Sequence, residues 1–325
     1  SLRRLQTMTM KTRADIGEHV SECLQLAVLL EISAYPKPGN VHRTADFKET
    51  RYEHFLASVV ALAPSFRIAA QKGVLMAQGK LNSDELEIGK IIKGAVEGVK
   101  SWQSGGNTLL GTIILLTPIA AAAGITLNQK SFSISKLRRN LRLVVKSSTP
   151  RDAVNVYDAI SIAEPGGLGK APKLDVSDPS SKQKILRENV TLFDVFKISS
   201  SWDSISSEWV NNYPVTFDMG YPYFAEILKE TNDVNIATVH TFLKILSEVP
   251  DTLVARKSGL ARAKDVSVQA RQVLDAGALT TRKGREKLLQ LDEKLRDAKH
   301  RLNPGATADL TSAVLAVAVL NGYRP

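Results

Sequence analysis

Apolar residues recur at helical spacing along almost the whole chain, and no segment of convincing length alternates between apolar and polar residues. In the first such stretch, Ile16, Val20 and Leu24 follow one another at intervals of four residues, and Pro36 ends the pattern. This spacing places side chains on one face of an α-helix, whereas a half-buried strand would alternate. The sequence therefore predicts an all-α protein. A parallel-sheet nucleotide-binding fold is disfavoured because its strands are missing.

The same spacing predicts the remaining helices, which we expect over residues 52–76, 86–102, 107–123, 132–145, 152–163, 191–212, 223–231, 235–248, 261–276, 281–300 and 308–320. Gly124 is expected to end one of them, and Pro64 to kink another. Thr149 and Pro150 form a good helix start, a capping side chain followed by proline in the first turn.

One stretch, residues 164–183, cannot continue a helix because it holds a Pro-Gly-Gly-Leu-Gly run and two further prolines. We predict a compact multi-helix single domain over residues 1–325, with residues 1–12 disordered and a long irregular loop over 164–183. Long loops in compact domains are usually functional or disordered.

The formal net charge of +10 attracts polyanions, whether nucleic acid, an anionic membrane or a multiply phosphorylated small molecule. No run of five Lys or Arg residues occurs and only 6% of residues are aromatic, which disfavours nucleic acid as a partner. The single cysteine, Cys23, fits a reducing compartment. The most apolar stretch, residues 109–123, is too short for a typical membrane span. We therefore expect a soluble, cytoplasmic protein that does not bind membranes; a homodimer is compatible with its apolar helices.

The loop Pro36–Arg43 holds two prolines, a glycine and two cations in eight residues. Gly39 would let the backbone approach a ligand closely, and Lys37 and Arg43 suit phosphate oxygens. The composition of the loop fits a phosphate-binding loop and a stiff interhelical turn equally well.

Two further segments could bind anions. Gly106, Asn107 and Thr108 precede the most apolar helix, where free backbone amides favour an anion, although Asn107 or Thr108 could be a plain N-cap. Downstream, Asp251 stands near two cations, Arg256 and Lys257. The carboxylate could bind a divalent metal and the cations a phosphate, or the aspartate could simply cap a helix.

Two carboxylates lie on apolar helix faces. Asp309 follows Gly305 at the start of the last apolar helix, and Glu31 ends the first one. A buried carboxylate is costly unless it pairs with a cation or a metal. Asp309, Asp251 and Glu31 are therefore our candidates for catalytic carboxylates and for metal ligands.

Four segments, in order, resemble one family, the ATP:dephospho-CoA triphosphoribosyl transferases. They are a helix-end Glu with Pro-Lys-Pro-Gly, a Gly-x-Asn-Thr-x-x-Gly stretch, an Asp-Thr followed by Arg, and a Pro-Gly-x-x-Ala-Asp-Leu stretch, found at Glu31–Gly39, Gly105–Gly111, Asp251–Gly259 and Pro304–Leu310. Asn40 and His42, and also Leu109 and Leu110, stand where the family usually has other residues.

The resemblance implies that a ribose hydroxyl of 3′-dephospho-CoA attacks the anomeric carbon of ATP, that adenine leaves, and that the triphosphate stays on the transferred ribose. It also implies Mg²⁺ or another divalent cation and cationic side chains around the triphosphate. A carboxylate would accept the hydroxyl proton. Two alternatives remain: an enzyme of the same fold that acts on another nucleotide or coenzyme acceptor, and a non-catalytic helical protein that binds nucleic acid.

Overall fold

A computed structural model describes residues 12–129, 131–166, 168–169 and 171–325, and these residues form helices but no β-strand. The prediction of an all-α fold is confirmed. The helices are α1 Arg13–Ser33, α2 Tyr52–Ala77, α3 Ile88–Trp102, α4 Leu110–Leu127, α5 Ile134–Lys146, α6 Pro150–Ala163, α7 Ser181–Arg187, α8 Leu192–Ser199, α9 Ser204–Asn211, α10 Tyr221–Thr231, α11 Val234–Glu248, α12 Thr252–Ser258, α13 Leu260–Asp275, α14 Arg282–Leu295 and α15 Gly305–Leu320. Short 3₁₀ turns cover Ser83–Glu85 and Ala278–Thr280, and a π-helix covers Val215–Gly220.

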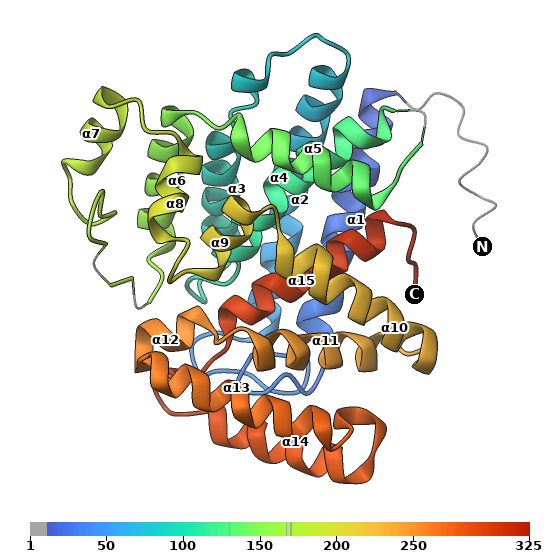
Figure 1. The fold of residues 1–325 in the computed structure, drawn as a ribbon. Helices are drawn as coiled ribbons and strands as arrows, with labels where there is room; N and C mark the ends of the chain where they lie inside the picture. The colour runs from blue at the N-terminus through green and yellow to red at the C-terminus, as the bar shows by residue number, and fades with distance from the viewer. Residues whose placement is uncertain (1–11, 130, 167, 170) are drawn as a thin grey trace.

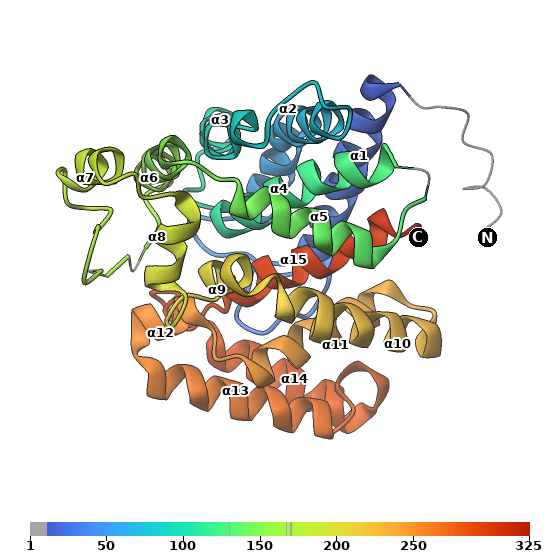
Figure 2. The same ribbon diagram turned by 45° about the horizontal axis from the view of Figure 1, so that its top comes forward.

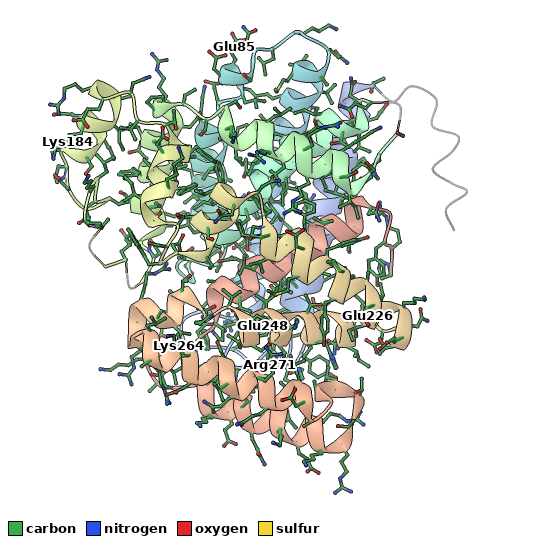
Figure 3. The ribbon with its side chains drawn as sticks, in the orientation of Figure 1. Glu85, Lys184, Glu226, Glu248, Lys264 and Arg271 are labelled. Carbon is green, nitrogen blue, oxygen red and sulfur yellow. The ribbon has the colours of Figure 1, made fainter. Side chains whose placement is uncertain are left out.

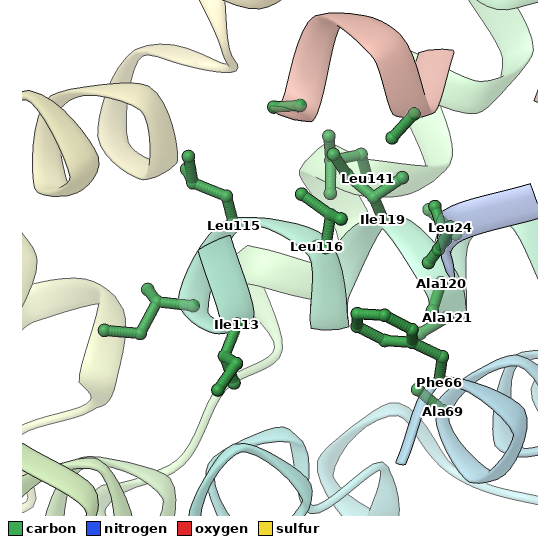
Figure 4. Close-up of a cluster of buried hydrophobic side chains, with 14 of the residues drawn as sticks. Leu24, Phe66, Ala69, Ile113, Leu115, Leu116, Ile119, Ala120, Ala121 and Leu141 are labelled. Atoms are coloured by element: carbon green, nitrogen blue, oxygen red, sulfur yellow. The ribbon is translucent and has the colours of Figure 1, made fainter. Parts of the chain in front are cut away.

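Helix α4 lies at the centre of the larger core and packs against α2, α3, α5 and α15 (Figures 1 and 2). Its side chains are apolar on all sides, as expected of a helix surrounded by others. In Figure 4, Leu116 of α4 lies in a cluster with Phe66 of α2, Leu24 of α1 and Leu141 of α5. Helices α1, α2 and α5 thus meet on this one helix.

The prediction that Gly124 ends its helix is wrong, because α4 continues to Leu127. A Cβ atom on Gly124 would collide with the backbone of Ala70 in α2, and one on Gly73 would collide with the backbone of Ala121 in α4. The glycine is therefore used for close packing between two helices and not for a C-cap. Both helices are long and apolar enough to cross a membrane, but half of the α2 window and 83% of the α4 window are buried inside the protein.

A smaller core joins α11, α13 and α14, which lie together at one end of the molecule (Figure 1). Phe242 of α11, Val266 of α13 and Leu288 of α14 are fully buried in it. Helix α15 connects the two cores because it packs on α1 and α4 as well as on α11.

Charged side chains cover the outside of these helices, and Figure 3 labels several of them, among them Glu85 and Lys264. One labelled pair, Arg271 of α13 and Glu248 of α11, forms an ion pair of 2.6 Å between Nη2 and Oε1. Both side chains are partly exposed, so this pair adds little to stability.

The predicted start at Thr149 is confirmed, since its hydroxyl accepts a hydrogen bond from the amide of Asp152, and the Asp152 carboxylate in turn accepts one from the amide of Thr149. The single helix predicted over 191–212 is wrong. Asp203 caps a new helix there and splits the segment into α8 and α9.

Other predicted bounds also change. The helix predicted over 281–300 ends at Leu295, and the sequence did not reveal the short helices α7 and α12. Between Glu164 and Ser180 the described residues form no helix. The predicted disorder of residues 1–12 falls almost wholly outside the described residues.

Candidate active site

A cavity of about 520 Å³ lies where the end of α1, the start of α4, helix α12 and the start of α15 converge. The loops over 37–50 and 164–176 form further parts of its wall. Nine of the twelve predicted site residues line it: Glu31, Lys37, Gly106, Asn107, Thr108, Arg256, Lys257, Gly305 and Asp309. The structure therefore brings together segments that are far apart in the sequence. Asp251, Gly39 and Arg43 do not line the cavity.

A buried ion pair lies at the inner end of the cavity. Nζ of Lys37 donates to Oε1 of Glu31 at 2.5 Å, and both side chains are almost completely shielded from solvent. Burial raises the pKa of Glu31 and lowers the pKa of Lys37, while each partner opposes the shift of the other. An ammonium group so desolvated interacts strongly with any phosphate that replaces water in the cavity.

Asp309 lies beside this pair on the second turn of α15. Its Oδ1 accepts two hydrogen bonds from Thr112, one from the backbone amide at 2.8 Å and one from the hydroxyl at 2.6 Å. Burial raises the pKa of Asp309 to about 7, the Thr112 bonds oppose this, and the Glu31 carboxylate adds to it. The side chain is still partly exposed to the cavity. A carboxylate with such a pKa can accept a proton near neutral pH.

Gly111 permits this arrangement. A Cβ atom at position 111 would collide with Oδ2 of Asp309. The small residue therefore makes room for the carboxylate at the start of α4. The sequence motif Gly105–Gly111 contains this glycine but does not predict its role.

Asp251 caps α12 and ties it to α15. Its Oδ1 accepts from the amides of Leu253 and Val254, and its Oδ2 accepts from the amide and hydroxyl of Thr307. The side chain is buried, and four donors surround its two oxygens. These contacts favour the capping role that the sequence left open, and the predicted catalytic and metal-binding roles of Asp251 receive no support from them.

The loop Pro36–Arg43 is clamped by α14. The amide of Gly39 donates to Oδ1 of Asp292 at 2.8 Å, and Nη2 of Arg296 donates to the carbonyl of Asn40 at 2.6 Å. A side chain at position 39 would have its Cβ only 2.6 Å from Cβ of Leu295, and the backbone there has φ +74°. Glycine is therefore needed for the loop to approach the helix.

Asp292 and Arg296 were not predicted from the sequence. They are spaced as neighbours on one helix face and form an ion pair of 3.0 Å, but nothing in the sequence indicated that they meet the loop. His42 completes the clamp, with Nε2 3.6 Å from Oδ2 of Asp292. Burial lowers the pKa of His42.

Of the two predicted cations of the loop, only Lys37 reaches the cavity. The guanidinium of Arg43 lies over the ring of Tyr35, 4.1 Å from its centroid, and is exposed. Elsewhere in the cavity lining, Arg256 pairs with Asp203 at 2.9 Å, and Nζ of Lys257 donates to the carbonyl of His300 at 3.4 Å.

Burial and the neighbouring Arg256 lower the pKa of Lys257. Two lysines that the sequence did not single out, Lys173 and Lys299, also line the cavity. Four cationic side chains therefore line the cavity in addition to the buried pair, which makes it suited to a ligand rich in phosphate.

The turn before α4 forms another part of the wall. Gly106 has φ +78°, and its carbonyl accepts from Nε2 of Gln103 at 2.8 Å. Oδ1 of Asn107 accepts from the amide of Leu110 at 3.2 Å, and the hydroxyls of Thr108 and Ser58 are 2.8 Å apart. The prediction of Asn107 as the N-cap is wrong, because Leu109 holds that position and Asn107 only accepts from the first amide of α4 across the turn. The amide Nδ2 of Asn107 has no partner among the residues that the structure describes.

Within the described ranges, no group of three or more His, Cys, Asp or Glu side chains is arranged to hold a metal ion. Oδ2 of Asp309 and Oε2 of Glu31 have no hydrogen-bond donor there. Any metal at this end of the cavity would need ligands from a bound phosphate as well as from these carboxylates.

The fold and the cavity together define an all-helical protein with a cationic pocket and a buried carboxylate of raised pKa in its lining. Residues 17–325 match the sequence model of the family described as ATP:dephospho-CoA triphosphoribosyl transferase, known as CitG. The chain belongs to this family, and it is therefore a transferase, as the resemblance implied.

Known proteins agree with this assignment. A protein of Pseudomonas fluorescens named a probable 2-(5''-triphosphoribosyl)-3'-dephosphocoenzyme-A synthase is 25% identical over 303 residues, which cover 92% of this chain and 90% of that protein. The synthase of Klebsiella pneumoniae is 36% identical over 89 residues, 27% of this chain and 29% of that protein. A crystal structure from Archaeoglobus fulgidus, named for the same synthase activity, covers 83% of this chain and 100% of its own, with a TM-score of 0.60 and 22% identity, and so shares the fold.

Proposed function

We propose that this protein transfers the 5-triphosphoribosyl group of ATP to a ribose hydroxyl of 3′-dephospho-CoA. The hydroxyl oxygen forms a bond to C1′ of the ATP ribose, and the bond between C1′ and adenine breaks. The hydroxyl proton passes to the carboxylate of Asp309, and the departing adenine takes up a proton. The triphosphate remains on the transferred ribose, so the products are adenine and the triphosphoribosylated coenzyme.

The observation that carries this proposal is the Asp309 carboxylate, whose pKa of about 7 suits a general base and which is accessible from the cavity. The carboxylates of Asp309 and Glu31 also place negative charge where an electron-deficient anomeric carbon would be stabilised. Lys37 and the cations Arg256 and Lys257 would hold the triphosphate oxygens.

We include Mg²⁺ in the proposal as a ligand of the triphosphate. When bound, it neutralises phosphate charge and fixes the orientation of the chain of phosphates. Glu31, whose second carboxylate oxygen has no donor in the described part of the chain, would supply the protein ligand, so that Asp309 stays free to accept the proton. Mg²⁺ commonly takes only one or two carboxylates together with substrate phosphates.

The proposal is tested by incubating the protein with ATP, Mg²⁺ and 3′-dephospho-CoA. Adenine should appear in chromatography, and mass spectrometry should show a coenzyme heavier by one triphosphoribosyl group. A reaction without acceptor serves as the control. If neither adenine nor a heavier product forms with this or any other acceptor tried, the proposed function is wrong.

A second candidate is the same transfer with another nucleotide or acceptor. It is favoured by Leu109 and Leu110, two apolar residues that line the cavity where the family usually has polar ones. Thermal stabilisation by a panel of nucleotides separates the two. Strict preference for ATP supports the first proposal, whereas preference for another base supports the second.

A further inference from the structure

A second cavity, of about 330 Å³, lies on the other side of the turn before α4. Residues 106–110 line both cavities, so this turn is a common wall. The turn is fixed in place: the hydroxyl of Thr50 donates to the carbonyl of Gly105 at 2.7 Å, and the side chain of Gln103 bonds both to Gly105 and to Gly106. Hydrogen bonds therefore hold the turn that separates the two cavities in a defined conformation.

The lining of the second cavity differs from that of the first. Its walls are mostly apolar, with Val99 of α3, Ile113 of α4, and Ile162 and Ala163 of α6 among them. Among the described residues of its lining, the charged ones are Lys100 and Glu164, which are exposed and of opposite sign. A ligand part that carries phosphate would gain little here, whereas an uncharged, partly apolar chain would bury its surface favourably.

At Gly106, the turn between the two cavities leaves room for a ligand to pass from one to the other. Gly106 has no side chain, and a Cβ atom built there would meet nothing within 4 Å. The neighbouring Asn107 offers a free amide, Nδ2, to a ligand that passes over the wall. An extended molecule can therefore have its phosphate-rich end in the first cavity and an uncharged end in the second.

We propose that the second cavity binds the pantetheine arm of the acceptor coenzyme. This inference rests on the proposed function, which requires 3′-dephospho-CoA as acceptor. The arm is uncharged, contains two amide groups and a branched apolar segment, and is joined to the nucleotide through phosphates. The first, cationic cavity would take the nucleotide and its phosphates, and the adjoining, mostly apolar second cavity would take the arm.

The test compares 3′-dephospho-CoA with ADP, which keeps the nucleotide but lacks the arm, as acceptors in the presence of saturating ATP. Ala163→Phe places an aromatic ring in the second cavity, and Ala163 does not line the first. The ratio of kcat/KM for 3′-dephospho-CoA to kcat/KM for ADP should fall about tenfold in this variant, because the binding free energy of the arm is lost. Ser161→Phe, an exposed change on the same helix outside both cavities, should leave the ratio unchanged.

Direct binding gives an independent measurement. Isothermal titration with pantetheine should show binding to the wild type and to Ser161→Phe, and none to Ala163→Phe. Ile162→Trp replaces Ala163→Phe if that variant does not fold. An unchanged acceptor ratio in the filled variant, or absence of pantetheine binding to the wild type, would overturn the inference. Absence of adenine release with every acceptor would instead refute the proposed function, while the titration still tests the cavity.

Discussion

Replacing Asp309 by Asn should make the protein more stable at alkaline pH while it removes activity. The ordinary carboxyl pKa of 3.8 is raised to about 7 by burial in the folded protein. Between these two values the folded protein holds a proton that the unfolded chain has released. The folded state therefore binds more protons, and stability falls as the pH rises through this window.

The size of the effect follows from the shift. About three pKa units at roughly 1.4 kcal/mol each give an upper limit of roughly 4 kcal/mol. Because Asp309 is open to water in the cavity, which screens its charge, we expect about 2–4 kcal/mol. An asparagine at this position is neutral at every pH and keeps an oxygen that can accept from Thr112.

Urea unfolding at pH 5 and pH 8 measures this difference. Asp309→Asn should exceed the wild type in free energy of unfolding at pH 8, and by less at pH 5. Adenine release should drop by about 10²–10⁴-fold, and wild-type kcat/KM should rise with pH and level off above about 7. Asp84→Asn, a change of an exposed aspartate, serves as the control and should alter neither quantity. An Asp309→Asn protein that keeps its activity, or that is no more stable than the wild type at pH 8, would refute the reasoning.

Three further predictions concern the surroundings of this carboxylate. Thr112→Val removes a hydroxyl donor to Asp309, so the pKa of Asp309 should rise and the pH–activity profile should move upward by about one unit; a profile in the wild-type position would contradict this. Gly111→Ala places a Cβ against the carboxylate and should lower kcat at least about tenfold, whereas Gly94→Ala, whose Cβ meets nothing, should leave kcat unchanged. Asp292→Ala frees the loop that carries the buried lysine, so steady-state kinetics should show a KM for ATP raised several-fold; an unchanged KM would show that the clamp does not position the loop.

Much of the fold could be predicted from the sequence because helical periodicity reports burial of one face. Predictions from local sequence signals were wrong where tertiary contacts determine the role of a residue. Gly124 has the residue type of a C-cap, yet it serves as a contact point between two helices. The break at Asp203 was missed because a capping aspartate inside an otherwise helical pattern is also compatible with a continuous helix.

For the site, the sequence indicated the carboxylates and cations on apolar helix ends, and the cavity brings most of them together. The role of Arg43 was not foreseeable, since its side chain turns outward over Tyr35. Asp292 lies on a helix whose pattern looks like an ordinary charged surface, and only the fold places it against the loop. The positions of Arg43 and Asp292 relative to the cavity depend on how the helices pack in three dimensions. Local sequence patterns carry no information on this packing.

The tie between Thr112 and Asp309 joins residues 197 positions apart, and the tie between Gly39 and Asp292 spans 253. Contacts of such long range form late, because closing the long loop between the two residues costs conformational entropy before the contact can stabilise the chain. Catalytic competence should therefore be the last property that the folding chain acquires. A refolding experiment that follows helix content and adenine release together should show the helices returning first. The newly made polypeptide would accordingly remain inactive until α15 has docked, whatever the state of its other helices.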